Sequence, residues 1–189
     1  MILIDETVFY NTYSEQLTVD RSKQLFENLK NLSWISYAFF PIILCMKFIF
    51  ITIVLYTGIF FYNLHDKIRF SAVLKVVIAS DGIFILAGLM KIFWFSFFAG
   101  NYNLNDLGFF YPLSLINLFR ISEVDKIWIH PLQVINVFQI IYFFALSFGL
   151  KNICCISRAE SEKIVSSTYF PALAIWIAFI MFISIDTVV

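Results

Sequence analysis

Four apolar segments dominate this chain, and each reaches or nearly reaches the length needed to cross a lipid bilayer. A hydrocarbon core about 30 Å thick requires roughly 20 apolar residues in a helix that rises about 1.5 Å per residue. Because 61% of the residues are hydrophobic, a soluble fold would leave most of this surface in water. The pattern predicts an all-α, polytopic transmembrane helical bundle whose long spans are residues 33–61, 73–98, 128–150 and 169–185.

The chain divides into a polar N-terminal tail, residues 1–32, and a single membrane domain, residues 33–189. From Asp20 onward, four apolar residues of the tail recur at helical spacing: Leu25, Phe26, Leu29 and Leu32. This spacing predicts an amphipathic helix. Such a helix either lies on the lipid headgroups or docks onto a partner. The interfacial alternative is favoured because the helix leads directly into a span.

A fifth apolar segment, residues 107–119, is too short to span the bilayer unaided. It either re-enters the membrane as a short helix or crosses it with the help of its flanks, which leaves four or five spans. Lys and Arg in short connections set the orientation. Both models place residues 151–167 in the cytoplasm and the C-terminus on the opposite side. They disagree about the side of the tail.

One internal repeat is visible, because residues 111–119 align without gaps to residues 130–138. Pro, Leu, Ile, Asn and Phe are identical in the two copies. The early proline predicts that each copy begins a helix, since proline suits the first helical turn. Asn117 and Asn136 would then lie at comparable depth on successive helices. They either line a small polar site or pore, or they act as interhelical hydrogen-bonding contacts, and the second alternative is favoured.

Lys47, Asp81 and Lys91 lie well inside the predicted spans, and Lys75 lies near the start of the second span. Charge at such depth is costly and is usually paired. Asp81 and Lys91 are too far apart on one helix to pair with each other. A contact between Lys47 and Asp81 on antiparallel neighbours is geometrically reasonable. The functional interpretation is a proton or ion relay, or a contact site for a partner helix. The structural alternative, which is favoured, is an ion pair with Lys91 extending to the headgroups.

Residues that carry chemistry are few. The two histidines, His65 and His130, show no metal-ligand spacing and lie beside no nucleophile, and the three cysteines are expected to be free thiols. We therefore expect no enzyme, no cofactor and no metal site. The thirteen basic and thirteen acidic residues cancel, which gives no indication of a nucleic-acid partner. The expected partners are the lipid bilayer and other membrane-protein subunits.

The layout, a polar tail followed by closely spaced helices that end near the C-terminus, resembles the Yip (Ypt-interacting-protein) superfamily and its small bacterial relatives. Two segments also look like helix starts of such proteins: Tyr111-Pro112-Leu113 and His130-Pro131-Leu132. The resemblance covers residues 33–185 and brings no catalytic motif. It implies a role in organising membrane traffic or complexes, and it favours the five-span model.

Together these features are typical of a bacterial inner-membrane protein. They predict a non-catalytic accessory subunit of a larger envelope complex, for example in protein export or transport. The reasons are the lack of a catalytic set, the amphipathic tail, and charges at depth that a partner can satisfy. The alternative is a small homo-oligomeric transporter or channel whose polar path between helices is lined by Asp81, Asn117 and Asn136.

Overall fold

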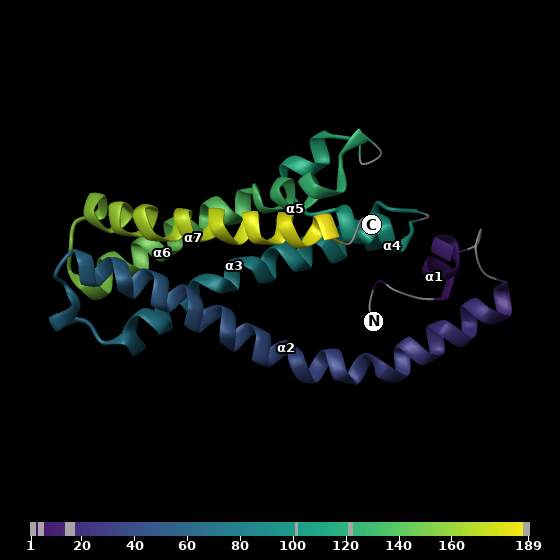
Figure 1. The fold of residues 1–189 in the computed structure, drawn as a ribbon, viewed down its shortest axis with the longest axis horizontal. Helices are drawn as coiled ribbons and strands as arrows, with labels where there is room; N and C mark the ends of the chain where they lie inside the picture. Colours follow the sequence, from purple (N-terminus) through teal and green to yellow (C-terminus); the bar gives the residue numbers. More distant parts are fainter. Residues whose placement is uncertain (1–2, 4–5, 14–17, 101, 121–122, 187–189) are drawn as a thin grey trace.

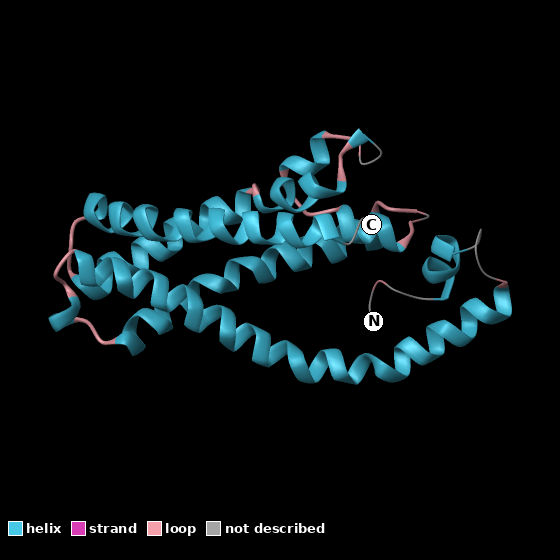
Figure 2. Ribbon diagram, viewed as in Figure 1, coloured by secondary structure: helices cyan, strands magenta, loops and turns pink. Residues whose placement is uncertain are grey.

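Four long helices form the bundle that the hydropathy predicts (Figure 1). The computed structural model describes residues 3, 6–13, 18–100, 102–120 and 123–186. The long helices are α2 (Val19–Phe61), α3 (Phe70–Phe97), α6 (Val137–Cys154) and α7 (Arg158–Asp186). Each contains a stretch that is long and apolar enough to cross a membrane. The described residues otherwise form short helices and loops (Figure 2), so the all-α bundle is confirmed.

Successive long helices run in opposite directions, which places the start of α2 and the end of α7 at the same end of the bundle (Figure 1). We call this the terminal end. The opposite end, which we call the hairpin end, holds the α2–α3 and α6–α7 connections. The first of these contains the short helix η1 (His65–Lys67), and the second is a turn in which Cys155 adopts a left-handed conformation with φ 52°.

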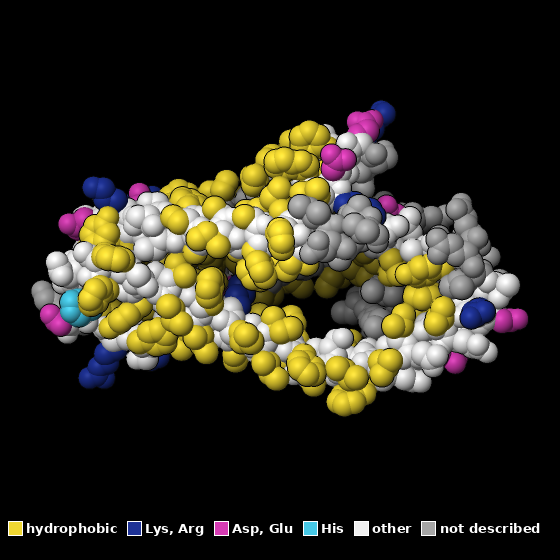
Figure 3. Space-filling model, in the orientation of Figure 1, with side chains coloured by type: hydrophobic (Ala, Val, Ile, Leu, Met, Phe, Trp, Pro, Cys, Tyr) yellow, Lys and Arg dark blue, Asp and Glu magenta, His cyan; other side chains and the backbone are white. Residues whose placement is uncertain are grey.

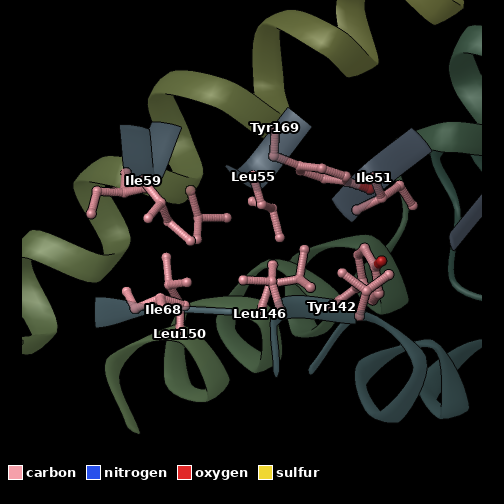
Figure 4. Packing of buried hydrophobic residues seen from close by; sticks show 12 residues of the cluster. Ile51, Leu55, Ile59, Ile68, Tyr142, Leu146, Leu150 and Tyr169 are labelled. Atoms are coloured by element: carbon pink, nitrogen blue, oxygen red, sulfur yellow. The ribbon is translucent and has the colours of Figure 1, made fainter. Parts of the chain in front are cut away.

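The core lies in the half of the bundle nearest the hairpin end (Figure 4). Residues four apart on one face of each helix meet there, as the helical period requires. Ile51, Leu55 and Ile59 of α2 face Tyr142, Leu146 and Leu150 of α6, and Ile164, Val165 and Tyr169 of α7 complete the cluster. Elsewhere the long helices expose large apolar side chains, as expected of surfaces in contact with lipid.

Two glycines allow close helix crossings. A Cβ atom added at Gly58 of α2 would lie 2.6 Å from Thr168 Cγ2 of α7, and one added at Gly149 of α6 would clash with Val76 of α3. Small residues at such positions let transmembrane helices pack backbone against backbone. The two crossings join α2 to α7 and α3 to α6.

The predicted amphipathic helix of the tail is continuous with the first span. Together they form α2, which at 43 residues is about 64 Å long. Pro41 lies inside this helix and has no N–H to donate to the preceding turn, which bends helices. The helix is bowed along its length (Figure 1). Leu25, Leu29 and Leu32 are exposed in the structure, as on the apolar face of an interfacial helix.

Between α3 and α6 the described residues contain no fifth spanning helix. They include the short helices α4 (Leu104–Phe109), η2 (Leu115–Leu118) and α5 (Lys126–Val134). A turn with Pro112, and with Leu113 at φ 52°, separates α4 from η2. The segment starts and finishes at the terminal end, where α5 packs beside α7 (Figure 1). Residues 107–119 therefore do not form one spanning helix, and four long candidate spans remain. Re-entry of residues 107–119 into the membrane stays a prediction.

The third apolar run is not a single helix, contrary to the prediction of one span over residues 128–150. The helix α5 ends at Val134, and α6 begins at Val137. Between them Asn136 is extended, with φ −142° and ψ 163°. Its side-chain oxygen accepts a hydrogen bond from Gln139 N at 2.8 Å and so caps α6. Hydropathy alone does not register this break, because the two residues on either side of Asn136 are apolar.

The two repeat copies do not both begin helices, which corrects the prediction. Pro112 lies in a turn, and Pro131 lies inside α5. The copies instead pair with each other through an isolated antiparallel bridge between Ser114 and Asn136. Leu115 N donates to Ile135 O at 3.0 Å, and Val137 N donates to Leu113 O at 3.1 Å. The two copies of the repeat therefore contact each other and do not form two equivalent helices.

Candidate functional site

An ion pair joins the first two spans inside the bundle. Lys47 Nζ of α2 lies 2.5 Å from Asp81 Oδ1 of α3. The Asp81 side chain is only 13% exposed, whereas that of Lys47 is 38% exposed. The ammonium also lies 4.7 Å from the ring centroid of Phe84, one turn after Asp81. The contact predicted from the sequence between Lys47 and Asp81 is present in the structure.

The pair lies near the middle of the spans. Lys47 precedes the end of α2 by 14 residues, and Asp81 follows the start of α3 by 11 residues. These spacings correspond to about 21 Å and 17 Å along the helices, measured from the hairpin end. In a hydrocarbon core about 30 Å thick, neither group reaches an interface easily. A buried opposite charge is then the main way to stabilise each of them.

Aromatic side chains connect the ion pair to α6 and α7. Phe84 packs on Tyr142 with ring centroids 5.0 Å apart, and Tyr142 packs on Tyr169 at 5.6 Å. Gln139 Nε2 donates a hydrogen bond to the Tyr169 hydroxyl. Both tyrosine rings lie beside Ile51, one turn beyond Lys47 (Figure 4). All four spans therefore contribute a polar side chain at this depth, a set that we call the polar cluster: Lys47, Asp81, Gln139, Tyr142 and Tyr169.

Sequence reasoning missed the α6 and α7 members of the polar cluster. Tyrosine counts among the hydrophobic residues, so a tyrosine within an apolar run is not recognised as a polar group. The spacing of Gln139 and Tyr142, three residues apart, is the signal that places both on one face of α6. Tyr142 is completely buried, and its hydroxyl has no hydrogen-bond partner among the described residues. Such an orphan group marks a polar site at the centre of the bundle.

Lys91 is not part of the polar cluster. It lies six residues before the end of α3, close to the terminal end, and its Nζ donates to the carbonyl oxygen of Leu107 at 2.6 Å. Leu107 belongs to α4, so the lysine ties α4 to α3. The bond to the Leu107 carbonyl gives the Lys91 ammonium a partner within the described chain, and the extension of Lys91 to the headgroups stays a prediction.

Asn117 and Asn136 do not form a pair of equivalent polar groups. Asn117 lies in η2, is exposed, and donates from Nδ2 to the carbonyl oxygen of Tyr111 at 2.6 Å. Asn136 is buried, caps α6, and donates from Nδ2 to the carbonyl oxygens of Gln133 and Val134. Both asparagines therefore hold their own local backbone. The structure does not place the two amides along a shared path.

The Tyr111 side chain lies outside the spans and interacts electrostatically with Asp81 of the polar cluster. Burial, and then the charge of the Asp81 carboxylate, raises the pKa of Tyr111 above its ordinary value. The first repeat copy is thus close enough to Asp81 to interact with it electrostatically. This arrangement brings the segment between α3 and α6 to the terminal side of the ion pair.

An opening is visible between the middle of α2 and the rest of the bundle (Figure 3). None of residues 23–46, which we call the arm, is buried, although residues 33–46 are almost entirely apolar. Packing of α2 begins just after Lys47, and Ile51 is its first buried residue beyond the arm. The ion pair therefore lies where the arm meets the bundle.

The short helix α1 (Glu6–Tyr13) closes the end of the opening that lies away from Lys47. Phe9 of α1 packs against Phe26 of α2 with ring centroids 5.8 Å apart. On its other side, Val8 is buried against Phe95 of α3 and Leu107 of α4. Thr12 Oγ1 accepts a hydrogen bond from Leu104 N at 2.9 Å. The helix α1 thus connects the start of α2 to the α3–α4 corner.

Groups that could support catalysis or metal binding do not converge here. His65 lies in η1 at the hairpin end, and His130 lies in α5. Within the described ranges, no three His, Cys, Asp or Glu side chains are placed to hold a metal ion. Chemically, the polar cluster can hold a charge within the membrane, and it can donate hydrogen bonds to neighbouring groups or accept hydrogen bonds from them.

Comparisons with known proteins add no relative. No protein-family model, curated protein or solved structure matches the chain. The class that the fold defines is an integral membrane protein with four candidate transmembrane helices.

Proposed function

We propose that this protein is a non-catalytic accessory subunit of a larger bacterial envelope complex, in protein export or transport, and that it binds a helix of a neighbouring membrane protein. The observation that carries this proposal is the arm. It includes an apolar stretch of α2 that no other part of the described chain covers, although the same helix is tightly packed beyond Lys47. A helix surface of this kind is suited to association with another transmembrane helix.

The Yip-like layout supports the same proposal. The resemblance to the Yip superfamily implies a role in organising membrane complexes and traffic. Such a role requires no catalytic motif. The position of the Lys47–Asp81 ion pair at the base of the arm agrees with such a role.

We infer the orientation from the basic residues in short connections. In the short connections the hairpin end carries Lys67, Arg69, Lys151, Arg158 and Lys163, whereas the α3–α6 segment carries Arg120 and Lys126. The start of α2, at the terminal end, adds Arg21, Lys23 and Lys30. The positive-inside rule then assigns the hairpin end to the cytoplasm of a bacterial inner membrane. Because both described ends of the chain lie at the terminal end, the C-terminus would be non-cytoplasmic, and so would the tail.

The proposal is tested by photo-crosslinking in membranes of the native host. A photoreactive residue replaces Ile43 of the arm, which is 61% exposed, or Ile175 of α7, which is 71% exposed. We expect a discrete adduct with another membrane protein from position 43 and only lipid adducts from position 175. Lipid adducts alone at both positions would contradict a subunit role that works through the arm.

A second candidate is a small homo-oligomeric transporter, which the polar cluster favours because all four spans contribute to it. The two candidates make opposite predictions for the purified protein in sealed vesicles. A transporter should support pH- or ion-dependent flux that Asp81→Asn abolishes. A subunit should show no flux of its own, and its adduct at position 43 should not be a second copy of the chain.

A further inference from the structure

A shallow groove runs along α7 near the hairpin end, on the side where α7 meets α6. Its volume is about 420 Å³, and it is lined by one residue of α6 and five residues near the start of α7: Phe143, Ala159, Glu160, Glu162, Lys163 and Ser166. Ala159, Lys163 and Ser166 follow one another at intervals of four and three residues, so they lie on one face of the helix. The groove is therefore elongated along the helix axis.

The groove crosses the boundary between the polar start of α7 and its apolar run. The helix begins at Arg158, and its apolar run begins at Tyr169. Because about 20 residues suffice to cross the hydrocarbon core, the part of α7 before the run lies at the level of the lipid headgroups. One turn into the run, Phe170 stacks on Phe143 with ring centroids 5.0 Å apart. The groove is thus charged at one end and aromatic at the other, which suits an amphipathic ligand.

The charged end of the groove contains both signs of charge and unused bonding capacity. Lys163 is exposed, and its ammonium has no ion-pair partner among the described residues. Glu160 Oε2 accepts hydrogen bonds from Ser157 N and Oγ at 3.0 and 2.9 Å, whereas no described group donates to Glu160 Oε1. Glu162 Oε1 accepts from Arg158 Nε at 2.7 Å, and Glu162 Oε2 likewise has no described donor. One ammonium and two carboxylate oxygens are therefore available to a ligand.

This combination of charges suits a zwitterionic headgroup that has N–H donors. A phosphate group pairs with a lysine ammonium, and a primary ammonium group donates hydrogen bonds to carboxylates. Phosphatidylethanolamine carries both groups in one headgroup. Phosphatidylcholine has the same charges but no N–H on its quaternary nitrogen. An anionic headgroup such as that of phosphatidylglycerol would bring a net negative charge beside two carboxylates, which repel it.

We propose that this groove binds one molecule of phosphatidylethanolamine. Its phosphate pairs with Lys163, its ammonium donates to Glu160 and Glu162, and one acyl chain lies against Phe143. A soluble compound with the same headgroup lacks the chain that the aromatic end of the groove accommodates. This inference goes beyond the proposed function and is independent of it, because a bound lipid is compatible with a subunit and with a transporter.

The test is native mass spectrometry of the full-length protein, released from detergent micelles and titrated with one lipid at a time. The lipids are phosphatidylethanolamine, phosphatidylcholine and phosphatidylglycerol with identical acyl chains. For the first bound lipid we expect phosphatidylethanolamine to bind about fivefold more tightly than phosphatidylcholine, as for an ion pair at an exposed site. Phosphatidylglycerol should bind no more tightly than phosphatidylcholine. Glycerophosphoethanolamine, which has no acyl chains, should not displace the lipid.

Variants assign the preference to the groove. In the double variant Glu160→Gln, Glu162→Gln, phosphatidylethanolamine should bind no more tightly than phosphatidylcholine. Glutamine at position 160 can still accept the hydrogen bonds from Ser157, so the start of α7 keeps its cap. Lys163→Gln should weaken both lipids alike, because both contain the phosphate. Asp66→Asn is the matched control, since Asp66 is an exposed carboxylate at the hairpin end that does not line the groove.

Each other outcome overturns the inference. Equal binding of phosphatidylethanolamine and phosphatidylcholine to the wild-type protein would show that the carboxylates do not recognise the ammonium, and this comparison needs no variant. Tightest binding of phosphatidylglycerol would mean that Lys163 recognises phosphate alone. A preference that persists in the double variant would place the lipid elsewhere on the surface. Displacement by glycerophosphoethanolamine would identify a soluble ligand in place of a lipid.

Discussion

Residues 33–46 and 48–61 of α2, on either side of Lys47, are similarly apolar but have opposite surroundings. Beyond Lys47, Leu55 and Ile59 are completely buried between α3, α6 and α7, whereas no residue of the arm is buried. The packed half has Gly58, which lets α7 approach its backbone closely, together with aliphatic residues four apart. The arm instead presents bulky side chains on every face: Trp34, Tyr37, Phe39 and Phe40 are all exposed.

This difference shows that hydropathy defines a span but not its packing. A helix that is apolar all round is stable against lipid without any protein neighbour, because its backbone is already hydrogen-bonded. Packing within the bundle requires in addition a stripe of complementary shape, with a small residue where two helices cross. The arm lacks such a stripe on the side that faces its own bundle. The partner that we propose for it is therefore another protein.

The largest expected effect separates the two halves directly. Leu55→Ala removes a completely buried side chain and should lower the free energy of unfolding by about 2–4 kcal/mol. Ile43→Ala, in the arm, should lower it by less than about 0.5 kcal/mol. Both are measured by denaturant titration in detergent micelles. Equal losses for the two variants would mean that the arm is packed as tightly as the rest of α2.

The next effect concerns the ion pair at the junction of the halves. Lys47→Met leaves the Asp81 carboxylate unpaired and should cost about 1–3 kcal/mol of the free energy of unfolding. The loss is smaller than for a sealed pair, because Lys47 is 38% exposed. The double variant Lys47→Met, Asp81→Leu should recover part of the loss. A double variant less stable than either single variant would rule out the pair as the link between the halves.

A smaller effect tests how α1 holds the arm. Thr12→Val removes the acceptor for Leu104 N and should weaken the docking of α1 by about 1 kcal/mol. Thr57→Val is the matched control in the packed half, because the Thr57 hydroxyl bonds only to Ile53 of its own helix. Hydrogen exchange at the Leu104 amide should accelerate several-fold in the first variant only. Unchanged exchange in Thr12→Val would show that α1 is held by its apolar contacts alone.

The smallest effect is a pH dependence that should arise outside the arm. Burial lowers the pKa of His130 below its ordinary value, so the folded protein binds a proton there less readily than the unfolded chain. The contribution of neutral His130 to the free energy of unfolding is therefore fully present above about pH 6.5 and is lost as the pH falls below that value. Denaturation measured at successively lower pH should show this decline in the wild type. In His130→Asn the slope in this range should be reduced, and an unchanged slope would assign it to other groups.

The sequence predicts the parts of this structure that depend on local composition. The sequence predicts the end of the first span at residue 61, where α2 ends. The contact of Lys47 with Asp81 was also predictable, because two opposite charges at matching depth on antiparallel neighbours have few other ways to be satisfied.

Features that depend on long-range contacts were not predictable in the same way. The two repeat copies share a sequence pattern but differ in conformation. Pro131 lies within a helix that begins upstream at Lys126, whereas Pro112 follows the end of α4 and lies in a turn. The bridge between Ser114 and Asn136 forms only when the chain folds back on itself. Likewise, the burial of Tyr142 against Phe84 depends on which face of α6 meets α3.

The most direct test of the account is a distance measurement between spin labels in lipid nanodiscs, on a variant without native cysteines. One pair joins Phe39 in the arm to Leu89 of α3, and a matched pair joins Phe50 to Ile78 on the packed side; all four are exposed. Both pairs keep the antiparallel register of Lys47 and Asp81. We expect a clearly longer distance between the spin labels of the arm pair than between those of the packed pair. Equal separations would show that the arm lies against the bundle, and would contradict the existence of a helix-binding opening.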